Sequence, residues 1–286
     1  MRTQLIAVML IAAALDAGCD RPRPVPARPA LFVVKDADTT IWLFGTVHAL
    51  PHNVVWRTPA IKRAIARADS LVTEIPAVDA RTAARVYDSY ARGERVAPVA
   101  GRLPATARPA YRAALARTGL DPAMLDRLDS WAVATAIEQA EVERQGADAG
   151  HGVEAVLAAD TLGKPRLALE SLAGQLALLD GLGPADQRQL LVRQLADPND
   201  YRRTLAAWAW GDLAALAASN DRLFAGAPTL EATLLTGRNA RWARWIAARL
   251  HRPGAIFVAV GAGHLAGPKS VIAMLRARGL RVARVQ

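Results

Sequence analysis

The chain has 286 residues, of which 52% are hydrophobic, and this is enough to bury the core of one large domain or two small ones. Its formal net charge of +10 would suit a nucleic acid or an anionic lipid, but the arginines are scattered through an alanine-rich chain, and this scatter argues against nucleic-acid binding. A single cysteine excludes an internal disulfide bond, so core packing must hold the fold together.

The first residues have the pattern of an export signal. Arg2 supplies positive charge, residues 5–15 are an unbroken apolar run, and the small residues Ala17 and Gly18 follow. A run of this length is too short to span a bilayer. We therefore predict a signal peptide over residues 1–18 and export of the protein.

Cys19 stands where bacterial lipoprotein signals place the cysteine that becomes lipidated. We expect it to anchor the protein in a lipid bilayer, at the periplasmic face of a bacterial membrane. Asp16 occupies the position three residues before Cys19 where an aliphatic residue is usual. Two alternatives therefore stay open: cleavage after Ala17 to give a soluble periplasmic protein, and an incidental cysteine.

A proline-rich segment separates this leader from the first predicted strands. Residues 19–29 contain four prolines and no apolar periodicity, which predicts an extended tether. The folded domain is expected over residues 30–286. It opens with two runs rich in β-branched and aromatic residues, 31–34 and 39–44, which a polar turn joins into a β-hairpin.

Helical and extended stretches follow in turn. Thr58 and Pro59 have the pattern of a helix start, and residues 70–75 are predicted as a strand. From 79 to 163 the pattern is helical, and a short strand is expected at 166–169. The sequence thus predicts a large helical insertion between the third and fourth strands.

The remaining residues return to strands after further helices. The helices are expected at 175–179, 184–195, 201–216 and 229–250. Residues 255–260 form a buried strand, 268–278 a helix and 280–285 a last strand, which is a typical βαβ unit. The predicted fold class is α/β, with a mixed central sheet flanked by helices and interrupted by the helical insertion.

Two of the predicted strands run directly into a Gly-x-x-His sequence. The first ends in Gly45 and His48, and the second ends in Gly261 and His264. A glycine at a strand end lets the backbone turn sharply with a positive φ, and a histidine three residues later can point across the strand ends, where open α/β sheets bind ligands. The residues alone leave a shared binding site and two buried structural histidines equally open.

Two further strands end in an acidic residue, Glu74 and Glu170. If the strands are parallel and adjacent, His48, His264 and Glu74 would converge at one sheet edge, with Glu170 nearby. They would offer nitrogen and oxygen ligands to a divalent transition metal, zinc included, which lowers the pKa of bound water and generates a hydroxide nucleophile. A salt bridge to an arginine is the competing interpretation, and for Glu170 it is at least as good.

Other motifs add little. No HExxH, GxSxG, phosphate-loop or GxGxxG sequence occurs, so the standard hydrolase and nucleotide-binding classes have no support. His52 follows His48 by four residues, but its neighbours favour an irregular loop. Arg238 follows Gly237 inside a helical stretch, and spacing alone favours a solvated helix surface for it.

Five segments of the chain together resemble the TraB/GumN family. These segments are LFGTVHALP at 43–51, LVTEIP at 71–76, ALE at 168–170, GRNARW at 237–242 and FVAVGAGHLAGP at 257–268. They occur in the family's order and span nearly the whole predicted domain, and the last is the most specific of them.

The resemblance implies a metal site. The family is related to the Tiki proteins, which are described as metal-dependent proteases with two Gly-x-x-His motifs and acidic residues at the site, using manganese or cobalt. By this resemblance His48, His264 and Glu74 become the metal-site residues. Glu170 and Arg238 become catalytic candidates beside Glu74, and Arg238 would hold a carboxylate or stabilise a developing oxyanion.

The implied activity is that of a metal-dependent hydrolase, a peptidase acting on a peptide or protein at the cell envelope. Related folds also include a haem-binding lipoprotein and an esterase that opens macrolide lactones. The main alternative is therefore a non-enzymatic lipoprotein that binds haem or another iron compound through the same histidines. An envelope scaffold with a degenerate site is a third hypothesis.

Overall fold

The computed structural model describes residues 23–93 and 97–286. The predicted signal peptide, Cys19 and the first residues of the predicted tether lie outside the described residues. Residues 25–29, which the sequence assigns to the tether, are part of the fold: β1 (Val25–Pro26) pairs in parallel with β4 (Val54–Val55), and Ala27 is buried. The pairing is possible because Val25 and Ala27 alternate with the prolines and donate their N–H groups to Asn53 and Val55.

Six strands of the described chain form one mixed sheet, in the order β6-β5-β7-β3-β2-β8. Their bounds are β2 Leu31–Lys35, β3 Thr39–Thr46, β5 Ser70–Thr73, β6 Arg166–Ala168, β7 Gly254–Gly261 and β8 Val282–Arg284. β2 and β3 form the predicted antiparallel hairpin, and β3, β7, β5 and β6 are parallel neighbours. β8 pairs antiparallel with β2 and therefore runs in the direction of β7, as the predicted βαβ unit requires.

Alternate side chains of the strands enter two separate cores, one on each face of the sheet. Phe44 and Phe257 pack on one face with α1 (Pro59–Arg67), α7 (Val153–Asp160) and α10 (Asp200–Ala209). Leu43 and Val258 pack on the other face with α13 (Gly237–Arg249) and α14 (Val271–Ala277). The molecule is an α/β fold, as predicted.

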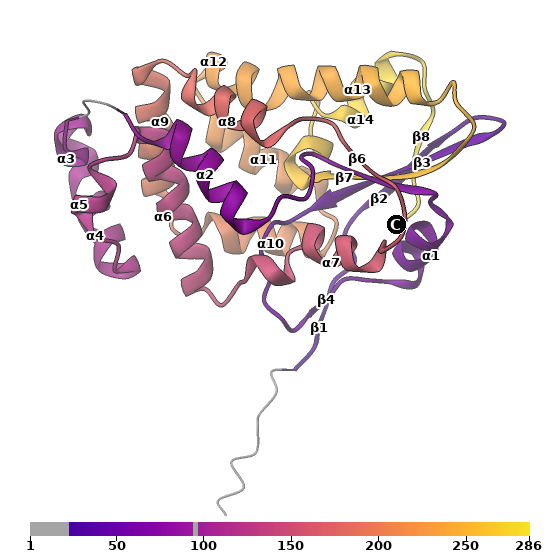
Figure 1. Cartoon of the computed structure of the whole chain (residues 1–286), viewed down its shortest axis with the longest axis horizontal. Coiled ribbons are helices and arrows are strands. Elements are labelled where there is room, and N and C mark those ends of the chain that lie inside the picture. Colours follow the sequence, from indigo (N-terminus) through magenta and orange to yellow (C-terminus); the bar gives the residue numbers. More distant parts are fainter. Residues whose placement is uncertain (1–22, 94–96) are drawn as a thin grey trace, which may run out of the picture.

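The helical insertion lies between β5 and β6, the third and fourth strands of the sheet along the chain. Its elements are α2 Ala80–Ala91, α3 Val99–Arg102, η1 Ala105–Ala107, α4 Arg108–Thr118, α5 Pro122–Leu125, α6 Ser130–Arg144, η2 Ala149–His151 and α7. Most of these helices lie to one side of the sheet, next to α9 (Pro184–Ala196), with which they share a core of their own (Figure 1). The insertion is thus a helical layer placed beside the sheet.

The other helices are α8 Leu172–Asp180, α11 Leu213–Phe224, α12 Pro228–Glu231, η3 Ala232–Thr236 and η4 Ala262–Leu265. The single helix predicted over 201–216 is wrong: α10 and α11 are separate, because Gly211 adopts a φ of 62° that ends α10. None of the helices in the two described ranges combines the length and the hydropathy of a membrane span.

The long helix predicted over 229–250 runs from α12 through α13, with the π-helical segment η3 inside it. A Cβ atom on Gly237 would lie 2.7 Å from the carbonyl oxygen of Ala232. The glycine therefore permits the wide turn, and this turn comes immediately before Arg238.

Candidate active site

The two Gly-x-x-His motifs lie side by side at the carboxyl ends of β3 and β7. The strands are parallel neighbours, with Gly45 opposite Val260 and Thr46 opposite Gly261. A Cβ atom on Gly45 would lie 3.0 Å from the Cα atom of Ala262, the second residue of the other motif. The first glycine therefore allows the two motifs to pack directly against each other, and the condition on which the shared site depended, parallel and adjacent strands, is met by β3 and β7.

The glycines serve a different purpose from the one predicted. Neither Gly45 nor Gly261 has a positive φ, so the expectation of a left-handed turn was wrong. A Cβ atom on Gly261 would lie 3.1 Å from Oε1 of Glu74 and 3.5 Å from Cδ2 of His264. The requirement for glycine is close packing: Gly261 leaves room for a carboxylate and an imidazole on the same side of the backbone.

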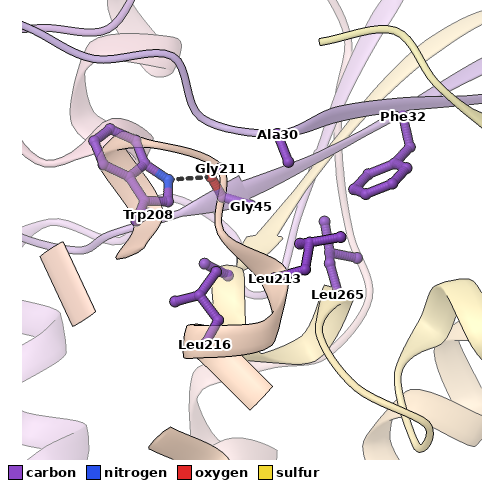
Figure 2. A pocket seen from close by; sticks show the side chains of 9 residues that line it. Ala30, Phe32, Gly45, Trp208, Gly211, Leu213, Leu216 and Leu265 are labelled. Carbon is purple, nitrogen blue, oxygen red and sulfur yellow. Dashed lines mark hydrogen bonds between the residues drawn. The ribbon is translucent and has the colours of Figure 1, made fainter. Parts of the chain in front are cut away.

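A hydrogen bond from Trp208 also holds the end of β3 in place. Nε1 of Trp208 donates a 2.8 Å hydrogen bond to the carbonyl oxygen of Gly45, in the pocket drawn in Figure 2. The remaining void there is about 10 Å³ and is lined mainly by apolar side chains such as Phe32 and Leu265, which is space for one water molecule at most. This region supports the motif and is too small to be a ligand site.

His264 has its ring fixed on both nitrogens. Nδ1 lies 2.6 Å from Oδ1 of Asn239, whose amide nitrogen donates to the carbonyl of Lys269, so Nδ1 must carry the proton. Nε2 is then the acceptor, 3.2 Å from Nη1 of Arg238, and the ring lies 4.5 Å from the Trp242 ring. Burial lowers the pKa of His264 to about 4, against the opposing charge of Glu74, so the ring is neutral at pH 7.

His48 has a matching arrangement. Its Nδ1 donates to Oε1 of Glu154 at 2.8 Å, and the same oxygen accepts a hydrogen bond from Thr46. Glu154 is in the first turn of α7, which can approach because a Cβ atom on Gly152 would lie 2.0 Å from the carbonyl oxygen of His48. The side chain of His48 is 75% exposed. The charge of Glu154 raises the pKa of His48 to about 9.

Glu74 is a buried carboxylate with three donors. Oε1 accepts the amide of Gly261 at 2.6 Å, and Oε2 accepts from Nη2 of Arg238 at 2.7 Å and from Nε2 of Gln175 at 2.9 Å. Burial raises its pKa, but the charge of Arg238 and the charge that His264 acquires below about pH 4 outweigh burial and lower the pKa of Glu74 to about 2. Glu74 is thus ionised throughout the physiological range.

Arg238 joins the two acidic residues that the sequence singled out. It is 7% exposed, and its guanidinium contacts both Glu74 and Glu170. Glu170 also accepts from Arg241 and from Nε1 of Trp242. The predicted surface position of Arg238 was wrong, and the salt bridge considered for Glu170 is present. Since the residues around the cavity do not include Glu170, this carboxylate acts on the site by holding Arg238.

The motifs open into a cavity of about 600 Å³ between the sheet edge and the helical layer. His48, His264, Glu74 and Arg238 all line it, together with residues of α6, α8, α10 and α11. His52 does not line it; its ring lies 6.2 Å from that of His151. The volume is in the range of sites that bind small molecules or short peptide segments.

The donor set partly matches a metal site. Each histidine has Nδ1 hydrogen-bonded to an oxygen, which is the second-shell arrangement usual for metal-binding histidines. Nε2 of His264 accepts from Arg238, so a metal ion there would have to displace this guanidinium nitrogen, and His48, whose pKa is raised to about 9, would have to release a proton. A carboxylate has about four lone-pair positions, and Glu74 uses three of them. In the described residues, however, no three His, Cys, Asp or Glu side chains are grouped closely enough to hold a metal ion.

The sequence predicted both histidines, both acids and, by resemblance, Arg238, but it missed Glu154, Asn239 and Gln175. Asn239 had a signal, because it follows Arg238 within the GRNARW segment. Glu154 and Gln175 come from helices far along the chain, and nothing in their local sequence indicates that they would bind His48 and Glu74.

Comparisons with known proteins agree with these motifs. A protein of Treponema pallidum (strain Nichols), described as uncharacterized, is 24% identical over 274 residues, which cover 86% of this chain and 80% of that protein. No solved structure matches the chain. Residues 30–284 match the TraB/PrgY/gumN family. Because this match covers nearly the whole folded domain, both Gly-x-x-His motifs included, the chain belongs to the TraB/PrgY/gumN family.

Proposed function

We propose that the protein is a metal-dependent hydrolase, a peptidase of the bacterial envelope, with His48 and His264 as nitrogen ligands of a divalent cation. One observation carries the proposal: each of the two histidines has its Nδ1 fixed by an oxygen acceptor, and both line the same cavity. Histidines that serve only the core have no need of this paired arrangement at a cavity wall.

Glu74 is suited to be the oxygen ligand rather than the general base. Its pKa of about 2 makes it a poor proton acceptor, whereas its charge and the unused lone pair on Oε1 suit a cation. Arg238 and Gln175 hold the carboxylate in one orientation beside His264. Manganese, cobalt and zinc are the candidate ions, and the bound ion would activate water and polarise a carbonyl group.

Glu138 of α6 is the cavity carboxylate best suited to move a proton. It lines the cavity and makes no hydrogen bond or salt bridge within the described part of the chain. Desolvation by the cavity wall raises the pKa of Glu138, and the charge of His48 opposes this only in part. A carboxyl group with a raised pKa accepts a proton from substrate or water more readily than Glu74, whose pKa is lowered.

Metal analysis of the protein purified without chelators tests the site. We expect about one divalent ion per chain in the wild type, and loss of this ion in His48→Ala and in His264→Ala. His251→Ala is the matched control, since His251 lies just after α13 and does not line the cavity. Occupancy that survives both cavity substitutions would refute the ligand assignment.

Activity is a separate measurement. The protein loaded with manganese, cobalt or zinc is incubated with a mixed peptide library, and cleavage is followed by mass spectrometry. Cleavage that requires the metal and is lost in His264→Ala supports the peptidase. A loaded protein that cleaves no peptide, or that instead binds haem with a Soret shift lost in His264→Ala, contradicts it.

A further inference from the structure

The exposed apolar side chains of the fold are unevenly distributed. In the described ranges, the exposed large hydrophobic residues are Val25, Val55, Met124, Leu162, Leu167, Trp210 and Val285. Four of these seven, Val25, Val55, Trp210 and Val285, lie around the point where the described chain enters the domain. Trp210 is 71% exposed, the largest apolar side chain left in solvent. Isolated exposed residues are ordinary, but such a gathering indicates an interaction surface.

Backbone contacts connect the four residues. Val25 and Val55 lie in the paired strands β1 and β4, which project at the lower edge of the view in Figure 1. Arg28 donates its N–H to the carbonyl of Ala209, the residue before Trp210. Arg284 approaches Gly211, the residue after Trp210: a Cβ atom added to Gly211 would lie 2.5 Å from Nη2 of Arg284. Val285 follows and donates to Leu31.

We name this surface the entry face; it consists of Val25, Arg28, Val55, Trp210, Arg284 and Val285. Its two arginines are exposed; Nε of Arg284 donates to the backbone oxygen of Gln286, and neither arginine forms a salt bridge with an Asp or Glu side chain in the part of the chain that the structure describes. The nearby acid Asp212 uses its carboxylate to cap α11 by accepting the amide of Ala215. The entry face therefore combines apolar side chains with two exposed positive charges.

We propose that the entry face rests on the surface of an anionic lipid bilayer. Tryptophan prefers the level of lipid headgroups, where its ring is half in the apolar layer and its N–H stays hydrated. Arg28 and Arg284 would contact lipid phosphates, and the net charge of +10 adds a general attraction. The inference concerns placement of the domain and does not depend on the proposed hydrolase.

The position of the face along the chain supports a lipid occupant over a protein partner. Cys19, the predicted lipid-anchor residue, precedes Val25 closely in the sequence. An extended chain covers about 3.3 to 3.6 Å per residue, so an anchor at Cys19 holds Val25 within roughly 20 Å of the membrane. With so short a connection, an anchor at Cys19 would keep the side of the domain that carries β1 near the bilayer.

Quenching by brominated lipid tests this contact in the full chain. The protein is reconstituted into vesicles of phosphatidylcholine and phosphatidylglycerol whose acyl chains carry bromine, and tryptophan emission is compared with that in unbrominated vesicles. All seven tryptophans lie in the described ranges, and Trp210 is the exposed one. We expect quenching in the wild type and its loss in Trp210→Phe. Trp245→Phe is the control, because Trp245 belongs to α13, far from β1 and β4 (Figure 1).

The charge contribution is tested in the same assay. Arg28→Gln combined with Arg284→Gln should reduce the quenching at least twofold in phosphatidylglycerol vesicles, as should raising the salt concentration. Unchanged unfolding midpoints show that the variants are folded, which is expected at exposed positions. Absence of quenching in the wild type, or quenching that persists in Trp210→Phe, overturns the proposal. Self-association that depends on Trp210 without lipid quenching also overturns it and assigns the face to a second copy of the chain.

Discussion

Arg238 is the counter-charge that two carboxylates, Glu74 and Glu170, share. Glu74 lies on one side of it and Glu170 on the other, and Nη1 reaches His264 as well. Arginine suits this position because its planar guanidinium group can donate hydrogen bonds to several acceptors at fixed angles. The residue also stacks over Trp242, 4.7 Å from the ring centroid. The chemistry of the cavity therefore depends on one side chain that the proposal does not place in contact with the metal.

Replacing Arg238 by methionine should destabilise the protein strongly. The change leaves Glu74 and Glu170 buried without their shared counter-charge, which typically costs about 3 to 5 kcal/mol. Urea unfolding at pH 7 measures the loss. Arg241→Met is the matched control: Arg241 contacts the same Glu170 but its side chain is 48% exposed, so its loss should be below about 1 kcal/mol. Equal losses in the two variants would contradict the role of burial.

For individual residues, the sequence predicted which side chains belong to the candidate site but not whether each is buried or exposed. His48 and His264 stood out because each follows a glycine at a strand end. Whether Arg238 faces solvent or the core depends on the turn of η3 and on two carboxylates contributed by other strands. No local pattern contains that information, and only the family resemblance indicated it.

The two strands β3 and β7 form the element that brings the motifs together. Their parallel register places Gly45 next to the second motif, and the close contact with Ala262 leaves no space for a side chain. The distance between the two histidines is thus set by the packing of one glycine against one alanine.

Gly45→Ala should therefore separate the motifs. Its Cβ would meet Cα and Cβ of Ala262 at 3.0 and 3.1 Å, and overpacking of this kind costs about 1 to 3 kcal/mol. Thermal unfolding measures the destabilisation, and metal content should fall with it. Gly101→Ala in α3 is the control, since no atom lies within 4 Å of its added Cβ. A Gly45→Ala variant as stable as Gly101→Ala would show that the strands can separate without cost.

The main elements were predictable because their patterns are local. The hairpin, the helix capped by Thr58 and the buried strand β7 all follow from periodicity and turn residues. β1 and β4 were not predictable, because a proline-rich segment forms a strand only when a partner accepts its few remaining donors. The break at Gly211 was missed for a related reason: a glycine within a helical pattern ends the helix only if the chain turns there.

At the scale of the whole molecule, the cavity exists because the helical insertion stands beside the carboxyl ends of the strands. Residues of α6 close one side of it and α11 the other, while the sheet supplies the histidines and Glu74. The position of each histidine between the sheet and the helices explains why burial dominates the pKa of His264 and not that of His48. His264 lies against α13, whereas His48 is open to the cavity.

The buried neutral His264 should make the stability of the whole fold depend on pH. Its pKa is about 4 in the folded protein and 6.5 when the chain is unfolded, so between these values the unfolded chain binds more protons. The contribution of His264 to stability is then fully present above pH 6.5 and decreases as the pH falls towards 4, by about 3 kcal/mol. Glu74, with a pKa of about 2, adds its own loss of stability below about pH 4.5, so the effect of His264 stands alone between pH 6.5 and 4.5.

Urea unfolding at pH 7, 6, 5 and 4 tests this on the wild type and on His264→Gln. The wild type should lose about 3 kcal/mol more than the variant across this range, because only the wild type has the buried imidazole. His251→Gln, at an exposed position outside the cavity, should follow the wild-type profile. Parallel profiles for the wild type and His264→Gln would mean that the imidazole takes up its proton without unfolding the site, and that burial by α13 does not keep it neutral.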